Sequence, residues 1–185
     1  MPIKSLIPFA FLLLSALQIP VSSAQDRLSA ASPTYRVNVG DELAVSVYAE
    51  PELTVTTRVT ETGVISYPLL GDVDVRGRTT REIEQRLVAG LKGPYLVDPK
   101  VTVSIRAFRP FFVNGEVQKQ GPVPFQPGIT VREAISLAGG FTERASQRKI
   151  FLIPEGRKNK TKGKKVSLDD LVGPGDVLTV EQSFF

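Results

Sequence analysis

The stretch Tyr-Arg-Val-Asn-Val-Gly-Asp-Glu-Leu-Ala-Val-Ser-Val-Tyr, residues 35–48, decides how this chain is organised. Apolar residues alternate with polar ones on both sides of Gly40-Asp41, at Val37 and Val39 before it and at Leu43, Val45 and Val47 after it. A period of two gives each strand one apolar face, so the pattern predicts two short strands. Glycine tolerates positive φ and aspartate bonds its local backbone, which predicts a tight turn between them.

A shorter copy of the same pattern lies at residues 172–180. There Gly175-Asp176 is the predicted turn, and Leu178 and Val180 alternate with more polar or smaller neighbours. Most of the chain lies between the two copies. We therefore expect the folded part to begin near Tyr35 and to end just after the second copy.

The first 24 residues have the pattern of a secretory signal peptide. A basic Lys4 precedes a short apolar run at 6–17, and Ser22-Ser23-Ala24 supplies the small residues of a cleavage site. An uncleaved membrane anchor is the alternative, but a helical span needs roughly 20 apolar residues. We predict an exported chain with a signal peptide at 1–24 and a mobile polar arm at 25–34.

The composition restricts the chemistry that the chain can perform. It contains no cysteine and no histidine, and its formal net charge is only +4. Thiolate metal sites, a Ser-His-Asp triad and a lipid-bearing cysteine are therefore absent. We expect no catalytic residues, no metal and no cofactor, and we predict that the protein is not an enzyme.

Two helices with matching starts indicate two related units. Gly-x-Thr-x-Arg-Glu occurs at 77–82 and again at 128–133, and each copy precedes an apolar pattern of helical period. Threonine followed three residues later by glutamate predicts a capping box. The alternative is that common capping motifs match by chance. We predict an α+β fold of two small β-rich modules at 35–108 and 109–185, each with one packed helix.

Together these motifs resemble the bacterial polysaccharide export family, the outer-membrane polysaccharide exporters. Residues 35–43 look like the start of the export domain, and 63–71 look like its Gly-x-Ile-x-x-Pro-x-x-Gly stretch. Residues 113–117 and 131–140 resemble a soluble-ligand-binding β-grasp (SLBB) domain, and 173–178 resemble its end. The resemblance covers about residues 35–182 and implies a β-grasp-like second module.

The family resemblance implies a homo-oligomeric ring in the periplasm that conducts capsular or exopolysaccharide toward the outer membrane. It also implies an inner-membrane polysaccharide copolymerase as partner. The sequence lacks the lipid-bearing cysteine, a second SLBB module and a C-terminal amphipathic helix of larger members. We therefore expect a periplasmic ring or collar associated with the outer membrane, with a separate outer-membrane pore protein. The alternative is a monomeric periplasmic glycan-binding module.

A basic segment is the candidate contact for polymer or partner. Its six cations are Arg157, Lys158, Lys160, Lys162, Lys164 and Lys165. Such a cluster attracts anionic polysaccharide, lipid head groups or an acidic protein, although a solvated hairpin tip has the same composition. Nucleic acid is not expected, because no aromatic residues interleave for base stacking.

Other polar and aromatic residues have structural interpretations beside functional ones. Asp72 and Asp74 share a predicted strand face and resemble a glycosidase pair, but edge solubility is the simpler interpretation. Asp169-Asp170 is expected in the first turn of a short helix. Gly139-Gly140 is expected to cap a helix rather than bind phosphate. The four tyrosines could stack on sugars, but we favour core positions for them: Tyr35, Tyr48, Tyr67 and Tyr95.

Overall fold

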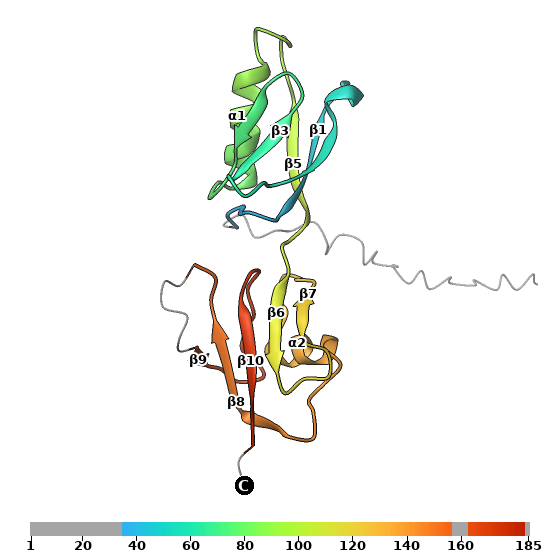
Figure 1. Ribbon diagram of the computed structural model, residues 1–185. Coiled ribbons are helices and arrows are strands. Elements are labelled where there is room, and N and C mark those ends of the chain that lie inside the picture. The colour runs from blue at the N-terminus through green and yellow to red at the C-terminus, as the bar shows by residue number, and fades with distance from the viewer. Residues whose placement is uncertain (1–34, 157–162, 184–185) are drawn as a thin grey trace, which may run out of the picture.

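The computed structural model describes residues 35–156 and 163–183. The predicted signal peptide and arm, and Arg157, Lys158, Lys160 and Lys162, lie outside this part. The chain forms two units, one above the other in Figure 1, which a single extended stretch joins between β5 and β6. Two hydrophobic clusters match these units, one drawn from residues 37–103 and the other from 111–180.

The first unit combines an antiparallel sheet, a hairpin and one long helix. The three-stranded sheet has the order β2-β1-β5, and β3 and β4 form a separate antiparallel hairpin. In chain order the elements are β1 Glu42–Val47, η2 Pro51–Leu53, β2 Val55–Arg58, β3 Val64–Tyr67, β4 Gly71–Asp74, α1 Thr80–Leu91 and β5 Val101–Ala107.

Helix α1 forms where the capping box predicts it. The Thr79 side chain accepts from the Glu82 backbone, and the Glu82 carboxylate accepts from the Thr79 N–H at 2.7 Å. Ile83, Leu87 and Leu91 follow at four-residue intervals and are completely buried. The helix therefore presents one continuous apolar stripe to the core of the first unit.

The second unit is a mixed five-stranded sheet in the order β7-β6-β10-β8-β9. Strands β6 and β10 are parallel, and every other neighbouring pair is antiparallel. In chain order the elements are β6 Phe111–Gly115, β7 Gly121–Val123, α2 Val131–Leu137, β8 Ala145–Ile153, β9 Lys164–Lys165 and β10 Val177–Gln182.

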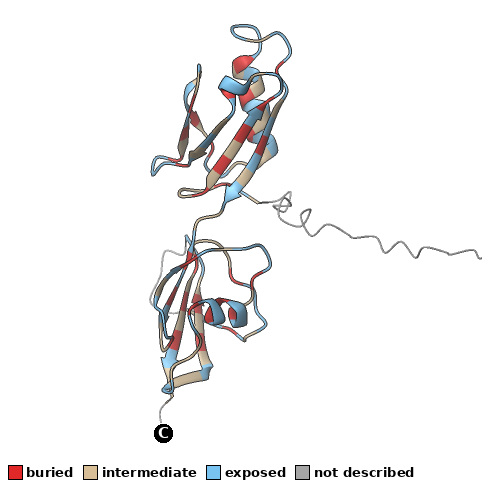
Figure 2. Ribbon diagram, turned by 90° about the vertical axis from the view of Figure 1, so that its right-hand side faces the viewer, coloured by how far each residue is buried: buried red, intermediate tan, exposed pale blue. Residues whose placement is uncertain are grey.

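Helix α2 covers one face of this sheet, as the edge-on view of Figure 2 shows. It has the same capping box as α1, with Thr130 and Glu133 bonded reciprocally. Its buried residues Val131, Ala134 and Ile135 belong to the second hydrophobic cluster. Gly139 and Gly140 both have positive φ, and the Gly140 N–H donates to the Ile135 carbonyl, which confirms the predicted cap.

The mixed α+β fold class is confirmed, but three local predictions are not. Residues 35–39 are no strand; Val37 instead exchanges backbone hydrogen bonds with residues 77 and 78. Residues 166–171 form a turn and an isolated bridge rather than a helix, so the helix-dipole interpretation of Asp169-Asp170 is wrong. The two units share the way their helices begin, as predicted. Their sheets are not alike, because they differ in the number and the direction of their strands.

Candidate functional site

The basic segment is only partly within the described residues. Lys164 and Lys165 form β9, the short edge strand that pairs with β8, and both side chains are exposed. The remaining four cations, Arg157, Lys158, Lys160 and Lys162, lie outside the described residues. The proposed polymer or partner contact therefore stays a prediction, now attached to one identified edge of the sheet.

The two Gly-Asp signals form the same turn. The Asn38 N–H donates to Asp41 Oδ2 at 2.8 Å, and the Gly173 N–H donates to Asp176 Oδ2 at 2.8 Å. Gly40 and Gly175 both have positive φ, at 89° and 81°. Each aspartate is three residues after its donor and is buried, Asp41 completely and Asp176 to 8% exposure. The sequence repeat therefore encodes one buried aspartate turn, used once in each unit.

The other carboxylate oxygen of each aspartate accepts a hydrogen bond from a backbone N–H that lies just after another strand, β5 for Asp41 and β8 for Asp176. Asp41 Oδ1 accepts from the Arg109 N–H at 2.9 Å, and Asp176 Oδ1 accepts from the Glu155 N–H at 3.0 Å. Arg109 lies between β5 and β6, where the chain passes from one unit to the other. Each turn thus fixes the backbone of a residue whose side chain faces the junction between the units.

Arg109 links the two turns through its side chain. Its Nη1 donates to Asp41 Oδ2 at 3.1 Å and to the Tyr35 hydroxyl at 2.7 Å. Its Nε donates to Glu155 Oε2 at 2.9 Å, and its Nη2 donates to the same oxygen. The Arg109 side chain is only 13% exposed. The guanidinium therefore joins a buried carboxylate of the first unit to a carboxylate of the second unit.

Aromatic rings continue this junction. Tyr35 packs edge-on against Phe108 with ring centroids 5.0 Å apart, and Phe108 packs edge-on against Phe125 at 5.3 Å. Burial and the hydrogen bond to Asp41 raise the pKa of Tyr35 above its usual range. The Tyr35 hydroxyl therefore stays protonated and donates to Asp41 at 2.7 Å. The junction contains one aromatic chain and one charged chain, and both run from unit to unit.

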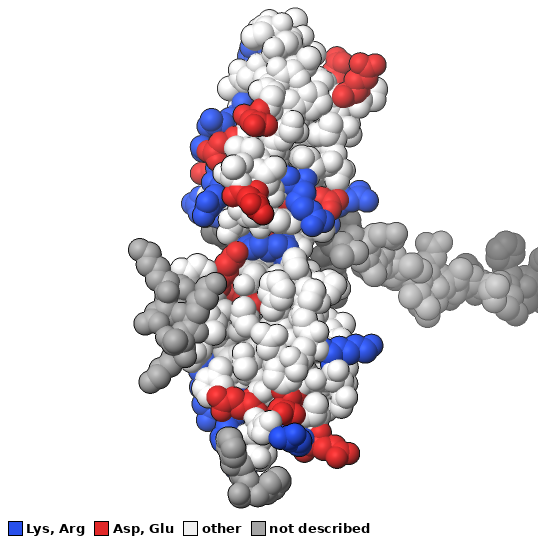
Figure 3. Space-filling model, in the orientation of Figure 1, with Lys and Arg blue, Asp and Glu red and all other residues white. Residues whose placement is uncertain are grey.

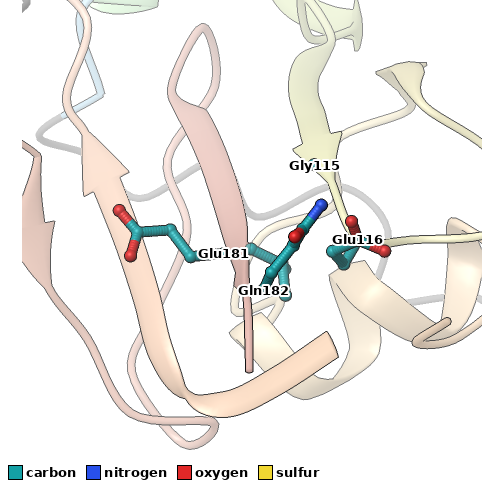
Figure 4. Close-up of a pocket in the computed structure, with 5 residues that line it drawn as sticks. Gly115, Glu116, Glu181 and Gln182 are labelled. Atoms are coloured by element: carbon teal, nitrogen blue, oxygen red, sulfur yellow. The ribbon is translucent and has the colours of Figure 1, made fainter. Parts of the chain in front are cut away.

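A second candidate site lies at the far end of the second unit. Gly115, Glu116, Val180, Glu181 and Gln182 line an open pocket of about 330 Å³ where the parallel strands β6 and β10 end. In Figure 4 the Glu116 and Gln182 side chains approach each other, whereas Glu181 extends away toward β8. Thr142 donates to Glu116, and bonds from Thr142 and Gln182 hold the pKa of Glu116 below its ordinary value.

The pocket contains hydrogen-bonding groups but no catalytic arrangement. A carboxylate and an amide can bind the hydroxyl groups of a sugar. The described residues contain no group of three or more acidic ligands that could hold a metal ion. Sequence reasoning did not identify this site, because its residues come from two strands more than 60 positions apart.

The remaining candidate residues separate into structural and exposed positions. Asp74 forms an ion pair with Arg78 at 2.9 Å, which lowers its pKa, and Asp72 is exposed. Tyr67 is buried and Tyr35 is half-buried, as expected for core tyrosines. Tyr48 and Tyr95 are 78% and 48% exposed, so the core expectation is wrong for them. Asp169 forms an exposed ion pair with Arg132.

Comparison with known families identifies both units. Residues 29–106 match the family model described as polysaccharide biosynthesis/export protein, and residues 110–168 match the SLBB domain. The chain therefore contains a polysaccharide biosynthesis/export domain followed by an SLBB domain. The description of the first family model names export, a transport function, in agreement with the prediction that the chain is not an enzyme. Residues 107–109 lie between the two matched ranges and include Arg109 of the junction described above.

Curated relatives carry names consistent with this family. The chain is 32% identical over 126 residues to the exopolysaccharide production protein ExoF of Rhizobium meliloti, covering 60% of this chain and 30% of ExoF. It is 27% identical over 188 residues to the EPS I polysaccharide export outer membrane protein EpsA of Ralstonia nicotianae, covering 84% of this chain and 49% of EpsA. The chain thus spans less than half of the length of each of these two relatives.

The described residues contain no helix that is both long and apolar enough to cross a membrane.

Proposed function

We propose that this protein is a periplasmic component of a polysaccharide export machine and forms a ring or collar that conducts polymer to the outer membrane. The observation that carries the proposal is the order of the two domains, an export domain followed by an SLBB domain, joined through Arg109. A conduit needs subunits of fixed shape that repeat around an axis. The Arg109 junction supplies this fixed shape within each subunit.

The partners follow from the same proposal. The polymer is a capsular polysaccharide or exopolysaccharide, and the relatives are named for the production or export of such polymers. An inner-membrane polysaccharide copolymerase delivers the polymer, and a separate outer-membrane protein supplies the pore. Export depends on the segment 1–24, whose sequence has the signal-peptide pattern. The basic segment at the β9 edge is the proposed contact with anionic polymer or with a partner.

The native mass of the chain tests this proposal. The chain is expressed with its N-terminal segment, extracted gently from the envelope, and measured by light scattering and electron microscopy. A closed multimer is the expected result. A monomer, in detergent and in the presence of its membrane partners, would contradict the ring.

The alternative is a monomeric periplasmic glycan-binding module, and the pocket at Glu116 and Gln182 favours it. Isothermal titration with oligosaccharides of the exported polymer distinguishes the two functions. Tight binding by a monomer, lost in Glu116→Gln, would favour the glycan-binding function. Assembly without measurable binding of short oligosaccharides would favour the conduit, because a polymer that slides must bind weakly at each step.

A further inference from the structure

The sheet of the second unit has an open face opposite α2. On each strand the residues that point to this face alternate with buried core residues. Strand register places them in two rows across the sheet. The first row contains Pro122, Phe112, Val177 and Ile153, and the second contains Asn114, Thr179, Phe151 and Lys165.

This open face is apolar in its middle and cationic at one edge. Phe112 is 41% exposed, and neither Phe112 nor Phe151 belongs to the hydrophobic cluster of the unit. Figure 3, which views the unit from this side, shows few charged atoms across the centre of the surface. Lys165 ends the second row, whereas Lys164 pairs with the core residue Leu152 and points by alternation to the other face. A monomeric protein rarely leaves such a sheet face uncovered.

The opposite side of the same unit has the complementary character. Leu137 on α2 is 56% exposed, and Leu171, which pairs with Thr130 at the start of α2, is 64% exposed. Three carboxylates and one guanidinium surround these leucines, and all four side chains are exposed: Arg132, Glu133, Asp169 and Asp170. The surface around Leu137 and Leu171 is therefore apolar and carries three carboxylates beside Arg132 and Lys119, whose backbone bonds to Ala138, whereas the open face is apolar with Lys165 at its edge.

We propose that the open sheet face of one copy packs against the α2 side of the next copy. The inference rests on the proposed ring and names the contact that builds it. Two complementary surfaces on opposite sides of one unit make a head-to-tail contact, because neither surface matches itself across a two-fold axis. Repetition of such a contact closes into a ring when a whole number of subunit rotations makes a full turn. Lys165 of one copy, opposite the α2-side carboxylates of the next, sets how the two surfaces align.

Single cysteines test the contact directly, because the chain has none of its own. Phe112→Cys marks the open face, and Leu171→Cys and Leu137→Cys mark the α2 side; all three side chains are at least 41% exposed. Differently tagged full-length variants are co-expressed and treated in the extracted assembly with a short bis-maleimide. We expect mixed dimers from Phe112→Cys with Leu171→Cys or Leu137→Cys, and no dimers from Phe112→Cys alone.

Val97→Cys is the matched control, since Val97 is 91% exposed on the first unit. Its mixture with Phe112→Cys should give no cross-link. Cross-linked dimers of Phe112→Cys alone would overturn the inference, because they show a two-fold contact between open faces. A multimer of native mass without cross-links from either α2-side position would overturn it too and leave the proposed function standing. A monomer would refute both.

Charge reversal supplies a second readout that does not depend on cross-linking. Lys165→Glu should weaken the assembly about tenfold per contact, because it places like charges opposite each other. Asp169→Lys should have a similar effect and little effect on folding, since its ion pair with Arg132 is exposed. The double variant should recover assembly. Failure of the double variant to recover, with both single variants folded, would count against the proposed register.

Discussion

Replacement of Arg109 by alanine should destabilise the protein more than the loss of any surface arginine. The substitution removes the guanidinium from Asp41, which is completely buried, and from the Tyr35 hydroxyl. Breaking a buried ion pair by removing one partner costs about 3–5 kcal/mol. Asp41 keeps three other donors, from Tyr35, the Asn38 N–H and the residue 109 N–H. We therefore expect a loss near the lower end, about 3 kcal/mol.

The contact with Glu155 adds less to this loss, because the Glu155 side chain is 36% exposed. Solvent screening limits such a pair to about 1 kcal/mol. For a chain of this size a total loss of about 3–4 kcal/mol lowers the melting temperature by about 10 °C. Arg109→Lys should recover only part of the loss, since an ammonium group cannot bind both carboxylates in the fork geometry of arginine.

Differential scanning calorimetry is the assay, with Arg132→Ala as the matched control. Arg132 forms an ion pair with Asp169 in which the two side chains are 59% and 85% exposed, so its removal should cost less than about 1 kcal/mol. Asp41→Asn and Asp176→Asn form a second matched pair, because the two turns are alike but only Asp41 contacts an arginine. Asp41→Asn should be the more destabilising. If Arg109→Ala loses no more stability than Arg132→Ala, the junction does not hold the two units together.

Three further predictions follow from single contacts. Gly115→Ala should destabilise the second unit by more than about 3 kcal/mol in urea unfolding, because the added Cβ would lie 2.0 Å from the Val180 carbonyl oxygen. The control Gly128→Ala has a similar φ but open space around it and should cost about 1 kcal/mol, so equal losses would contradict the steric argument. Hydrogen bonds from Thr79 and Thr130 lower the pKa of Glu82 and Glu133. Both caps therefore stabilise the fold above the unfolded pKa of about 4.3 and lose this effect as pH falls through the folded pKa. Glu82→Gln with Glu133→Gln should make the melting temperature fall less steeply at acid pH, and an unchanged slope would refute this. Glutamine at Lys158, Lys160, Lys162 and Lys164 should leave the melting temperature unchanged and weaken co-sedimentation with anionic polymer, whereas a large fall in melting temperature would show that the segment is structural.

The sequence predicts local features of the fold well, because their causes are local. Thr79 and Glu82 are three residues apart, so their capping box is visible without a structure. The two Gly-Asp turns are predicted for the same reason, since the backbone donor is three residues before each aspartate. The expected strand at 35–39 fails because the alternation of Val37 and Val39 reports burial, whereas the backbone partner of this segment is the turn at 77–78.

The candidate sites are harder to predict, because their residues come together only in the folded chain. Arg109 beside Pro110 reads as a boundary between two units, and nothing near it in sequence indicates Asp41 or Glu155, which are 68 and 46 positions away. The pocket at Glu116 depends on the parallel pairing of β6 with β10, which no local pattern specifies. The pattern of apolar residues does not predict that Tyr48 and Tyr95 are exposed, because both lie in loops just after regular elements.

The junction and the proposed contact between copies act on different parts of the same assembly. The head-to-tail contact involves the second unit alone, so it fixes how SLBB domains repeat around an axis. The first unit has no part in that contact, and the junction around Arg109 determines where it sits relative to the axis. Arg109→Ala should therefore retain the cross-link between Phe112→Cys and Leu171→Cys at temperatures where both units are folded, and yet blur the first unit in images of the multimer. A variant that loses the cross-link together with the order of the first unit would show that both units build the contact.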